Sequence, residues 1–248
     1  MNETVLLAVA DGVATITLNR PASRNAVDTA MCEALLASAL GAAADETVRV
    51  VLVRGNGPVF CAGADLKERQ GMTEDQVRAR RLKAFAAYDA LERLPMPAIA
   101  VVTGPAIGSG CEIAAACDFI VATPEASFRT PEALWGTIGA TQRLPRVLGK
   151  RLAKDLMFTG RSLSAAEAQA AGLVARVIAA DQLEAALAGI LKPIVAAPPL
   201  ALRLAKRCID TGVELDPKGA LETELAAIEE NLAGGAWRSA IESFGKRA

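Results

Sequence analysis

Two glutamates stand in sequence contexts that could do acid-base chemistry. Glu112 lies in "GSGCEIAAACDFIVA", residues 108–122, and its neighbours in that stretch are small or apolar. Glu132 follows Pro131 in "FRTPEALWG" and opens a second predicted helix, because proline fits the first helical position. A buried carboxyl group is a usable acid or base, whereas a solvent-facing glutamate in a first turn only interacts with the helix dipole. Two carboxyls beside one oxyanion site would suit adding or removing water next to a carbonyl.

Two glycine-containing loops lead from predicted buried strands to helix starts. They are "NGPVFCAGAD" and "GPAIGSG", and they end near Ala64 and Ser109. Backbone N–H groups at a helix N-terminus have no intrahelical acceptor, and the helix dipole adds partial positive charge there. One N–H from each loop would form an oxyanion hole if the two converged on a single oxygen. The alternative is that both loops are ordinary tight turns.

The composition excludes several other chemistries. The chain has 248 residues and no histidine, which excludes Ser-His-Asp and Cys-His pairs and histidine-ligated zinc. The five cysteines are spread through apolar surroundings, as reduced, buried thiols are. A nucleotide-phosphate motif fails, because Gly149-Lys150 is followed by Arg151 and not by Ser or Thr. We therefore expect a reaction that needs no metal and no redox cofactor.

Charge and hydropathy bear on location and partners. The chain carries 27 basic and 28 acidic residues, so its net field favours neither nucleic acid nor an anionic membrane. No signal-peptide pattern is present, and no apolar stretch approaches the roughly 20 residues of a membrane-spanning helix. We expect a cytoplasmic protein that binds neither nucleic acid nor a membrane.

The strand and helix patterns around these candidate residues predict an α/β fold. "VLLAVADGVATITLN" reads as a hairpin around Asp11-Gly12, and Asp28 is the predicted N-cap of the next helix. Buried strands at "VRVVLVRG" and "AIAVVTG" flank a helix from Thr73, which begins a capping box, to Leu94. Strand, loop, small residues and helix start recur in "VVLVRGNGPVFCAGADL" and "AIAVVTGPAIGSGCEIA". This weak internal repeat favours a coiled α/β architecture.

The pattern changes at about Asp181. Residues 1–180 are predicted to form the α/β core that carries the site, and residues 181–248 a C-terminal helical region interrupted at "APP". The last helices contain apolar residues that a short tail cannot bury on itself: Leu225, Ile228, Leu232, Trp237 and Ile241. We therefore expect this region to join subunits in an oligomer.

Six motifs in order cover nearly the whole chain. They are "LNRPASRNAVD", "FCAGADLKE", "GPAIGSGCEIAAACDFIVA", "FRTPEALWGTIGATQRLPRVLG", "TGRSLSAAEAQAAGLVARVI" and "FGKRA". In these motifs the sequence resembles the crotonase superfamily and, within it, the enoyl-CoA hydratases. The resemblance implies a crotonase-like spiral of β-β-α units whose C-terminal helical region forms a homotrimer or a dimer of trimers. It also implies water addition across the 2,3 double bond of an enoyl-CoA thioester, giving 3-hydroxyacyl-CoA, as in the breakdown of fatty acids or related acyl groups.

The resemblance assigns roles by position. It implies that Ala64 and Ser109 supply the two oxyanion N–H groups. It implies that Glu112 and Glu132 are the two acids, with Glu112 deprotonating the water and Glu132 protonating the α-carbon. Coupled carboxyls exchange roles easily, so which glutamate is the base stays open. Coenzyme A enters as part of the substrate, and no separate cofactor is expected.

The resemblance also implies contacts with coenzyme A and substrate at eight positions: Arg24, Ala26, Ala62, Ala64, Asp65, Leu66, Lys67 and Ser109. Of these, Arg24 and Lys67 are candidates for the coenzyme A phosphates or adenine, and the alternative is that both are solvated surface charges. Phe244 and Lys246 would reach the coenzyme A of a neighbouring subunit.

The sequence departs from the hydratase pattern at two places. Ser109 stands where many relatives have glycine, so its side chain narrows the space while its backbone N–H remains. The segment "TIGATQRL" gives a shortened loop after Thr137 at the expected acyl pocket, and we expect an altered chain-length preference. Isomerisation, dehydration and decarboxylation use the same oxyanion hole but often lack one acid. A non-catalytic scaffold would have no reason to keep both.

Overall fold

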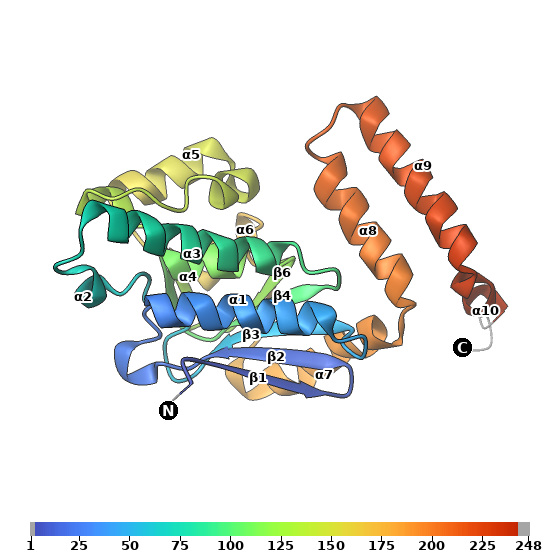
Figure 1. The fold of residues 1–248 in the computed structure, drawn as a ribbon, viewed down its shortest axis with the longest axis horizontal. Helices are drawn as coiled ribbons and strands as arrows, with labels where there is room; N and C mark the ends of the chain where they lie inside the picture. The colour runs from blue at the N-terminus through green and yellow to red at the C-terminus, as the bar shows by residue number, and fades with distance from the viewer. Residues whose placement is uncertain (1–2, 243–248) are drawn as a thin grey trace.

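A six-stranded sheet with helices on both faces forms the body of the protein in a computed structural model, which describes residues 3–242 (Figure 1). The strands are β1 (Val5–Ala10), β2 (Val13–Leu18), β3 (Val50–Gly55), β4 (Ala98–Val102), β5 (Pro105–Ile107), β6 (Phe119–Ala122), β7 (Ser127–Arg129), β8 (Leu163–Ser164) and β9 (Arg176–Val177). The α-helices are α1 (Thr29–Ala44), α2 (Leu66–Arg69), α3 (Glu74–Glu92), α4 (Ser109–Ala115), α5 (Arg143–Thr159), α6 (Ala165–Ala170), α7 (Leu183–Ala196), α8 (Pro199–Gly212), α9 (Pro217–Gly234) and α10 (Ala236–Glu242). Short 3-10 helices cover Pro21–Ser23, Glu132–Trp135 and Ala180–Gln182.

The main sheet has the strand order β1-β2-β3-β4-β6-β9. Only β1 and β2 pair antiparallel, and every other neighbouring pair is parallel. The predicted hairpin is confirmed, since Asp11 and Gly12 both have positive φ, 50° and 78°, as a type I′ turn requires. Parallel pairing directs the ends of β3, β4 and β6 to one edge of the sheet, so the loops that follow them meet.

Helices cover both faces of the sheet, as the continuous apolar strands predicted. Alternate residues of β3 point to opposite faces: Val51 and Val53 join the core beneath α1 and α3, and Leu52 packs in the cluster with Leu187 of α7. The N-cap of α1 is confirmed, because the Asp28 carboxylate accepts a hydrogen bond from the Met31 N–H at 2.8 Å.

The two halves of the weak repeat lie side by side. Cys61, in the loop after β3, pairs with Ala106 of β5 in a parallel bridge. The bond from Ile107 N–H to the Cys61 carbonyl measures 2.8 Å. The strands β5 and β7, which the sequence did not indicate, form a second sheet with β8. This small sheet holds the two glycine-containing loops against each other.

The C-terminal helices do not all share one environment. Helix α7 packs against the main sheet, while α8 and α9 lie side by side and extend away from the α/β body (Figure 1). Leu225 and Ile228 of α9 are exposed. Within residues 3–242, no single helix has the length and apolarity to span a bilayer. One bent pair, Ala180–Ala196 and Pro199–Gly212, qualifies by length and composition only.

Candidate active site

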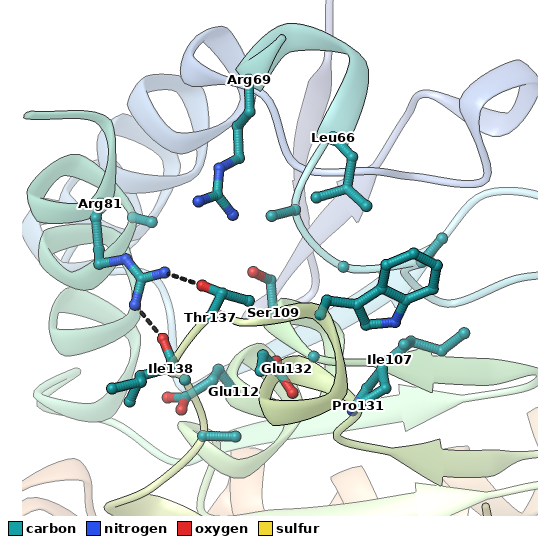
Figure 2. A pocket seen from close by; sticks show the side chains of 18 of the residues that line it. Leu66, Arg69, Arg81, Ile107, Ser109, Glu112, Pro131, Glu132, Thr137 and Ile138 are labelled. Carbon is teal, nitrogen blue, oxygen red and sulfur yellow. Dashed lines mark hydrogen bonds between the residues drawn. The ribbon is translucent and has the colours of Figure 1, made fainter. Parts of the chain in front are cut away.

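A cavity of ≈ 280 Å³ lies between helices α2 and α3, the start of α4 and the turn that follows β7 (Figure 2). Its lining brings together the four residues that the sequence put first: Ala64, Ser109, Glu112 and Glu132. They come from segments up to 68 positions apart, from 64 to 132. The volume is at the small end of the ~300–1,000 Å³ typical of ligand pockets.

The backbone N–H groups of Ala64 and Ser109 are both available to a ligand. Val27 donates to the Gly63 carbonyl and accepts from the Asp65 N–H, both at 2.8 Å, so Val27 makes no bond to the intervening Ala64 N–H. Ser109 is the first residue of α4 and has no intrahelical acceptor. Neither N–H has a hydrogen-bond partner within residues 3–242. A Cβ on Gly63 would lie 3.9 Å from Ser109 N, so the two loops meet at this point.

Two features of the structure favour glycine at position 108. Its φ of +52° with ψ of −109° is a conformation that L side chains rarely adopt. A Cβ at this position would lie 2.5 Å from Glu132 Oε1, inside van der Waals contact. The Gly108 N–H donates to the Arg129 carbonyl at 2.8 Å, which ties the start of α4 to the end of β7. The missing side chain therefore lets the Glu132 carboxyl reach the second oxyanion loop.

Glu112 is buried, with 6% of its surface exposed, in the first turn of α4. Its Oε2 atom lies 2.9 Å from Nη1 of Arg143 at the start of α5. Arg143 also binds Glu92 of α3, with Nε 3.0 Å from Oε2. A buried carboxylate is costly unless it is paired, so Arg143 explains how an acid is tolerated among apolar neighbours. The sequence does not indicate that Arg143 is the partner of Glu112, although Arg143 lies in the "TQRL" segment of one of the six motifs.

Glu132 differs from Glu112 in backbone and in charge environment. The predicted helix is only a 3-10 turn, Glu132–Trp135, with Pro131 as its N-cap and not as its first residue. It ends at Gly136, which has φ of +67°. Glu132 Oε2 is buried without a hydrogen-bond partner in the described part of the chain. Burial, followed by the nearby Glu112 carboxylate, raises the pKa of Glu132, and a backbone hydrogen bond and Arg81 oppose this. Of the two acids, Glu112 has a fixed cationic partner, and Glu132 is the one whose raised pKa favours the protonated form.

Tyr88 is a further polar residue of the cavity that no sequence motif indicated. It is 2% exposed on α3, and its hydroxyl faces the Ser109 side chain but has no hydrogen bond of normal geometry within residues 3–242. Burial raises the pKa of Tyr88, so the group stays a neutral hydroxyl. It is a hydrogen-bond donor available beside the oxyanion loop.

The loop after Thr137 lines the cavity at the place where an acyl pocket was expected. Arg81 of α3 holds this loop by donating to Thr137 Oγ1 at 2.8 Å and to the Ile138 carbonyl (Figure 2). Trp135 and Ile138 are 70% and 72% exposed while also lining the cavity. They form an apolar rim at its mouth.

The residues implied for coenzyme A divide into two groups. Ala62, Ala64, Leu66 and Ser109 line the cavity. Arg24, Ala26, Asp65 and Lys67 are not among the lining residues. Arg24 is nevertheless adjacent, because its carbonyl accepts the Ala62 N–H at 2.9 Å.

The side chains of this second group serve different purposes. The Asp65 carboxylate caps α2 by accepting the Lys67 N–H at 3.0 Å, and it also pairs with Arg20 at 2.9 Å. The Asp65 side chain therefore has a structural role. Lys67 is exposed and has no ion-pair partner within residues 3–242.

Asn25, which no sequence pattern indicated, supports the first of the two glycine-containing loops. It is fully buried and donates to the Val59 carbonyl at 2.8 Å, just before Cys61.

Comparison with known proteins places this geometry in a family. The family model described as enoyl-CoA hydratase/isomerase matches residues 8–245. The chain belongs to the enoyl-CoA hydratase/isomerase family. It is 39% identical over 229 residues to enoyl-CoA hydratase domain-containing protein 2, mitochondrial, of Bos taurus, covering 89% of this chain and 77% of that one.

Solved structures of the family share the whole fold. A crystal structure of an enoyl-CoA hydratase from Bacillus anthracis superimposes with a TM-score of 0.94 at 36% identity, covering 98% of this chain and 96% of that one. A Thermobifida fusca structure in complex with acetoacetyl-CoA gives a TM-score of 0.85 at 29% identity, covering 94% and 96%. The predicted crotonase fold with its C-terminal helical region is confirmed, and the protein is a crotonase-family enzyme.

Proposed function

We propose that the protein hydrates 2-enoyl-CoA thioesters to 3-hydroxyacyl-CoA. The observation that carries this proposal is the pair of unlike carboxyls beside two unpartnered N–H groups. Glu112 is paired with Arg143, and the pKa of Glu132 is raised by burial and by Glu112. A coenzyme A thioester as substrate is supported by family membership and by the acetoacetyl-CoA bound in the Thermobifida fusca relative.

The N–H groups of Ala64 and Ser109 would bind the thioester oxygen. As water attacks, electrons move from the double bond toward this oxygen, and the enolate-like charge is stabilised by both donors. Each well-placed donor contributes about 3–4 kcal/mol in comparable sites. Because the two N–H groups are fixed by the bridge to Val27 and by α4, they need little reorganisation during the reaction.

The two acids would divide the proton transfers. Glu112, held in place by its ion pair with Arg143, takes a proton from water as the oxygen bonds to the β-carbon. Glu132, which burial biases toward the protonated form, gives its proton to the α-carbon. One proton is accepted and one is donated, so one water is added across the double bond, and transfer of the proton from Glu112 to Glu132, directly or through solvent water, restores both groups for the next turnover. Because these two groups fill both proton-transfer roles, we propose that no metal or redox cofactor takes part.

We also propose that the active form is a homo-oligomer, a trimer or a dimer of trimers, assembled through α8 and α9. These helices expose apolar side chains on the part that extends from the body: Ile209, Leu221, Leu225, Ile228 and Leu232. Light scattering at micromolar concentration tests this, and a monodisperse monomer would refute it. The implied contacts of Phe244 and Lys246 with a neighbour lie outside the described residues.

Purified protein with 2-enoyl-CoA and 3-enoyl-CoA thioesters of increasing chain length tests the reaction. We expect loss of the conjugated 2-enoyl thioester absorbance and a product heavier by one water, unaffected by a chelator. Conversion of 3-enoyl to 2-enoyl thioesters without a hydrated product would instead identify an isomerase. A protein that binds these thioesters and converts none of them would be a scaffold.

A further inference from the structure

Three guanidinium groups lie along the wall of the cavity formed by α2 and α3. Arg69 is the last residue of α2, Arg80 and Arg81 follow on α3, and all three line the cavity. Figure 2 shows the Arg69 side chain pointing from α2 into the cavity, with Leu66 on one side and Arg81 on the other. This wall faces the loops that carry the Ala64 and Ser109 N–H groups. The proposed hydration gives no role to its three arginines.

Two of the three arginines already have structural partners. Arg80 is 7% exposed, and its Nε lies 2.8 Å from Oε2 of Glu68. Within the described part of the chain, the Arg81 side chain donates to two neutral groups, the Thr137 hydroxyl and the Ile138 carbonyl, and these bonds fix the loop at the mouth of the cavity. Both side chains are therefore held in place.

Arg69 is different, because its guanidinium has no hydrogen bond or ion pair within residues 3–242, while its backbone carbonyl accepts the Met72 N–H. It is half-buried, and burial followed by the charges of Arg81 and Arg80 lowers its pKa. No acidic side chain within residues 3–242 pairs with its guanidinium. A half-buried cation beside two others is unfavourable unless an anion joins it.

The acids near the cavity are committed elsewhere. Glu68 pairs with Arg80 and also accepts the Thr29 N–H at 2.8 Å. Glu112 is paired with Arg143, and the burial of Glu132 works against its ionisation. None of these three acids is therefore free to pair with Arg69.

We propose that Arg69 binds a carboxylate at the far end of the acyl group, so that the preferred substrates are short enoyl-CoA thioesters with a terminal carboxylate. This inference rests on the proposed function for the orientation of the substrate. With the thioester oxygen on Ala64 and Ser109 and the double bond beside the glutamates, the rest of the acyl group extends toward the α2–α3 wall. The small cavity suits a short chain.

The coenzyme A phosphates are a second source of negative charge, and the experiment separates the two. Dissociation constants are measured by calorimetry for glutaryl-CoA and valeryl-CoA, which share a five-carbon chain and differ in the terminal carboxylate. The same pair of acyl groups is measured on pantetheine, which lacks the phosphates. The proteins are the wild type, Arg69→Met, Arg69→Lys and the control Arg78→Met, whose side chain is exposed and paired with Asp75.

We expect wild type to bind the glutaryl thioesters at least tenfold more tightly than the valeryl thioesters on either carrier. Arg69→Met should weaken glutaryl binding by about 10- to 100-fold and change valeryl binding by less than about threefold. Arg69→Lys should keep part of the preference, and Arg78→Met should keep all of it. Thermal midpoints of the variants show that each is folded.

Two results would overturn the inference. If Arg69→Met weakens glutaryl-CoA and valeryl-CoA equally and leaves both pantetheine thioesters unchanged, Arg69 binds a coenzyme A phosphate. If it changes none of the four, Arg69 binds no substrate. Because saturated thioesters are used, the result does not depend on hydration. Hydration of glutaconyl-CoA against 2-pentenoyl-CoA, measured separately, tests the proposed function.

Discussion

The walls that carry Glu112 and Glu132 are built in opposite ways. Glu112 is on α4, in the buried core, and its carboxylate is fixed by Arg143. Glu132 is on a single 3-10 turn whose following residues are exposed, and one of its oxygens has no partner in the described chain. Both are first-turn acids, so the helix dipole acts on each and cannot explain the difference.

The contrast shows how one cavity can hold a base and an acid of the same residue type. A carboxyl group with a fixed cation favours the charged form, while a half-buried carboxyl beside another carboxylate favours the neutral form. The partner residue, more than the glutamate itself, sets the role.

The largest effect is expected from removing either acid. Glu112→Gln and Glu132→Gln keep shape and hydrogen bonding but cannot transfer a proton, so the hydration rate should fall by about 100- to 10,000-fold. The double variant should be little slower than the slower single variant, because residues that act as a unit are not additive. Steady-state rates and substrate dissociation constants, measured together, check this.

A different outcome would identify the acids as structural only. Each Gln variant would then keep its turnover and lose up to about 1 kcal/mol of stability, the value of a first-turn acid. Such a result would remove the catalytic assignment for that residue.

Arg143→Met should lower the hydration rate by about 10- to 100-fold at neutral pH. Without the cation, the buried Glu112 carboxylate loses the partner that fixes its position and compensates its burial. Arg143→Lys should restore most of the rate. Arg146→Met, which breaks the exposed pair with Glu214, is the control and should keep the wild-type rate. A wild-type rate in Arg143→Met would mean that the pair is structural.

Gly108→Ala tests the close approach of Glu132 to the second oxyanion loop. The added Cβ would collide with Oε1, and we expect about a tenfold loss of hydration together with about 1–2 kcal/mol of lost stability from the positive φ. Gly172→Ala is the control, because Gly172 has φ of +83° with nothing within 4 Å of its Cβ position. It should lose similar stability and no activity. Equal activity in the two variants would contradict the steric explanation.

The smallest effect concerns stability and pH. The pKa of Glu132 is raised above its ordinary value of 4.5, so the folded protein binds more protons than the unfolded chain just above that pH. Stability should therefore fall as pH rises through this window, and Glu132→Gln should gain stability relative to wild type by an amount that grows with pH and then levels off. Each kcal/mol corresponds to about 2–4 °C in midpoint for a chain of this size.

The control variant, Glu167→Gln, should change stability with pH in the opposite direction. Hydrogen bonds from the Ser164 backbone and side chain lower the pKa of Glu167, so Glu167→Gln should lose stability relative to wild type as pH rises. Thermal scans between pH 4 and about pH 8 check both variants. The same trend in both would show that the effect does not come from Glu132.

Local features of the fold were predictable because local chemistry determines them. The turn at Asp11-Gly12, the Asp28 cap and the capping box at Thr73 all follow from residues within four positions of each other. Helix α3 ends at Glu92 and not at Leu94, a difference within the fraying of helix ends. The positions of Ala64, Ser109, Glu112 and Glu132 were predictable because glycine-containing loops and acids at helix starts carry recognisable patterns.

Long-range partners were not predictable from the same patterns. Arg143 is 31 positions from Glu112, and nothing in the local sequence of either residue indicates the pair. The strands β5 and β7 have three residues each, too few for a periodic signal. Arg69 stands in an ordinary charged stretch, and only the folded chain shows that it points into the cavity without an acid.

The exposed position of Trp135 at the cavity mouth should make its fluorescence sensitive to a bound ligand. The chain has two tryptophans, and Trp135 both lines the cavity and is 70% exposed. The other, Trp237, lies on α10, where its indole N–H donates to the Leu232 carbonyl. A ligand that fills the cavity will displace water from the Trp135 indole, shifting its fluorescence emission to shorter wavelength. The protein therefore carries its own reporter of occupancy, by which unlabelled thioesters can be ranked without any turnover.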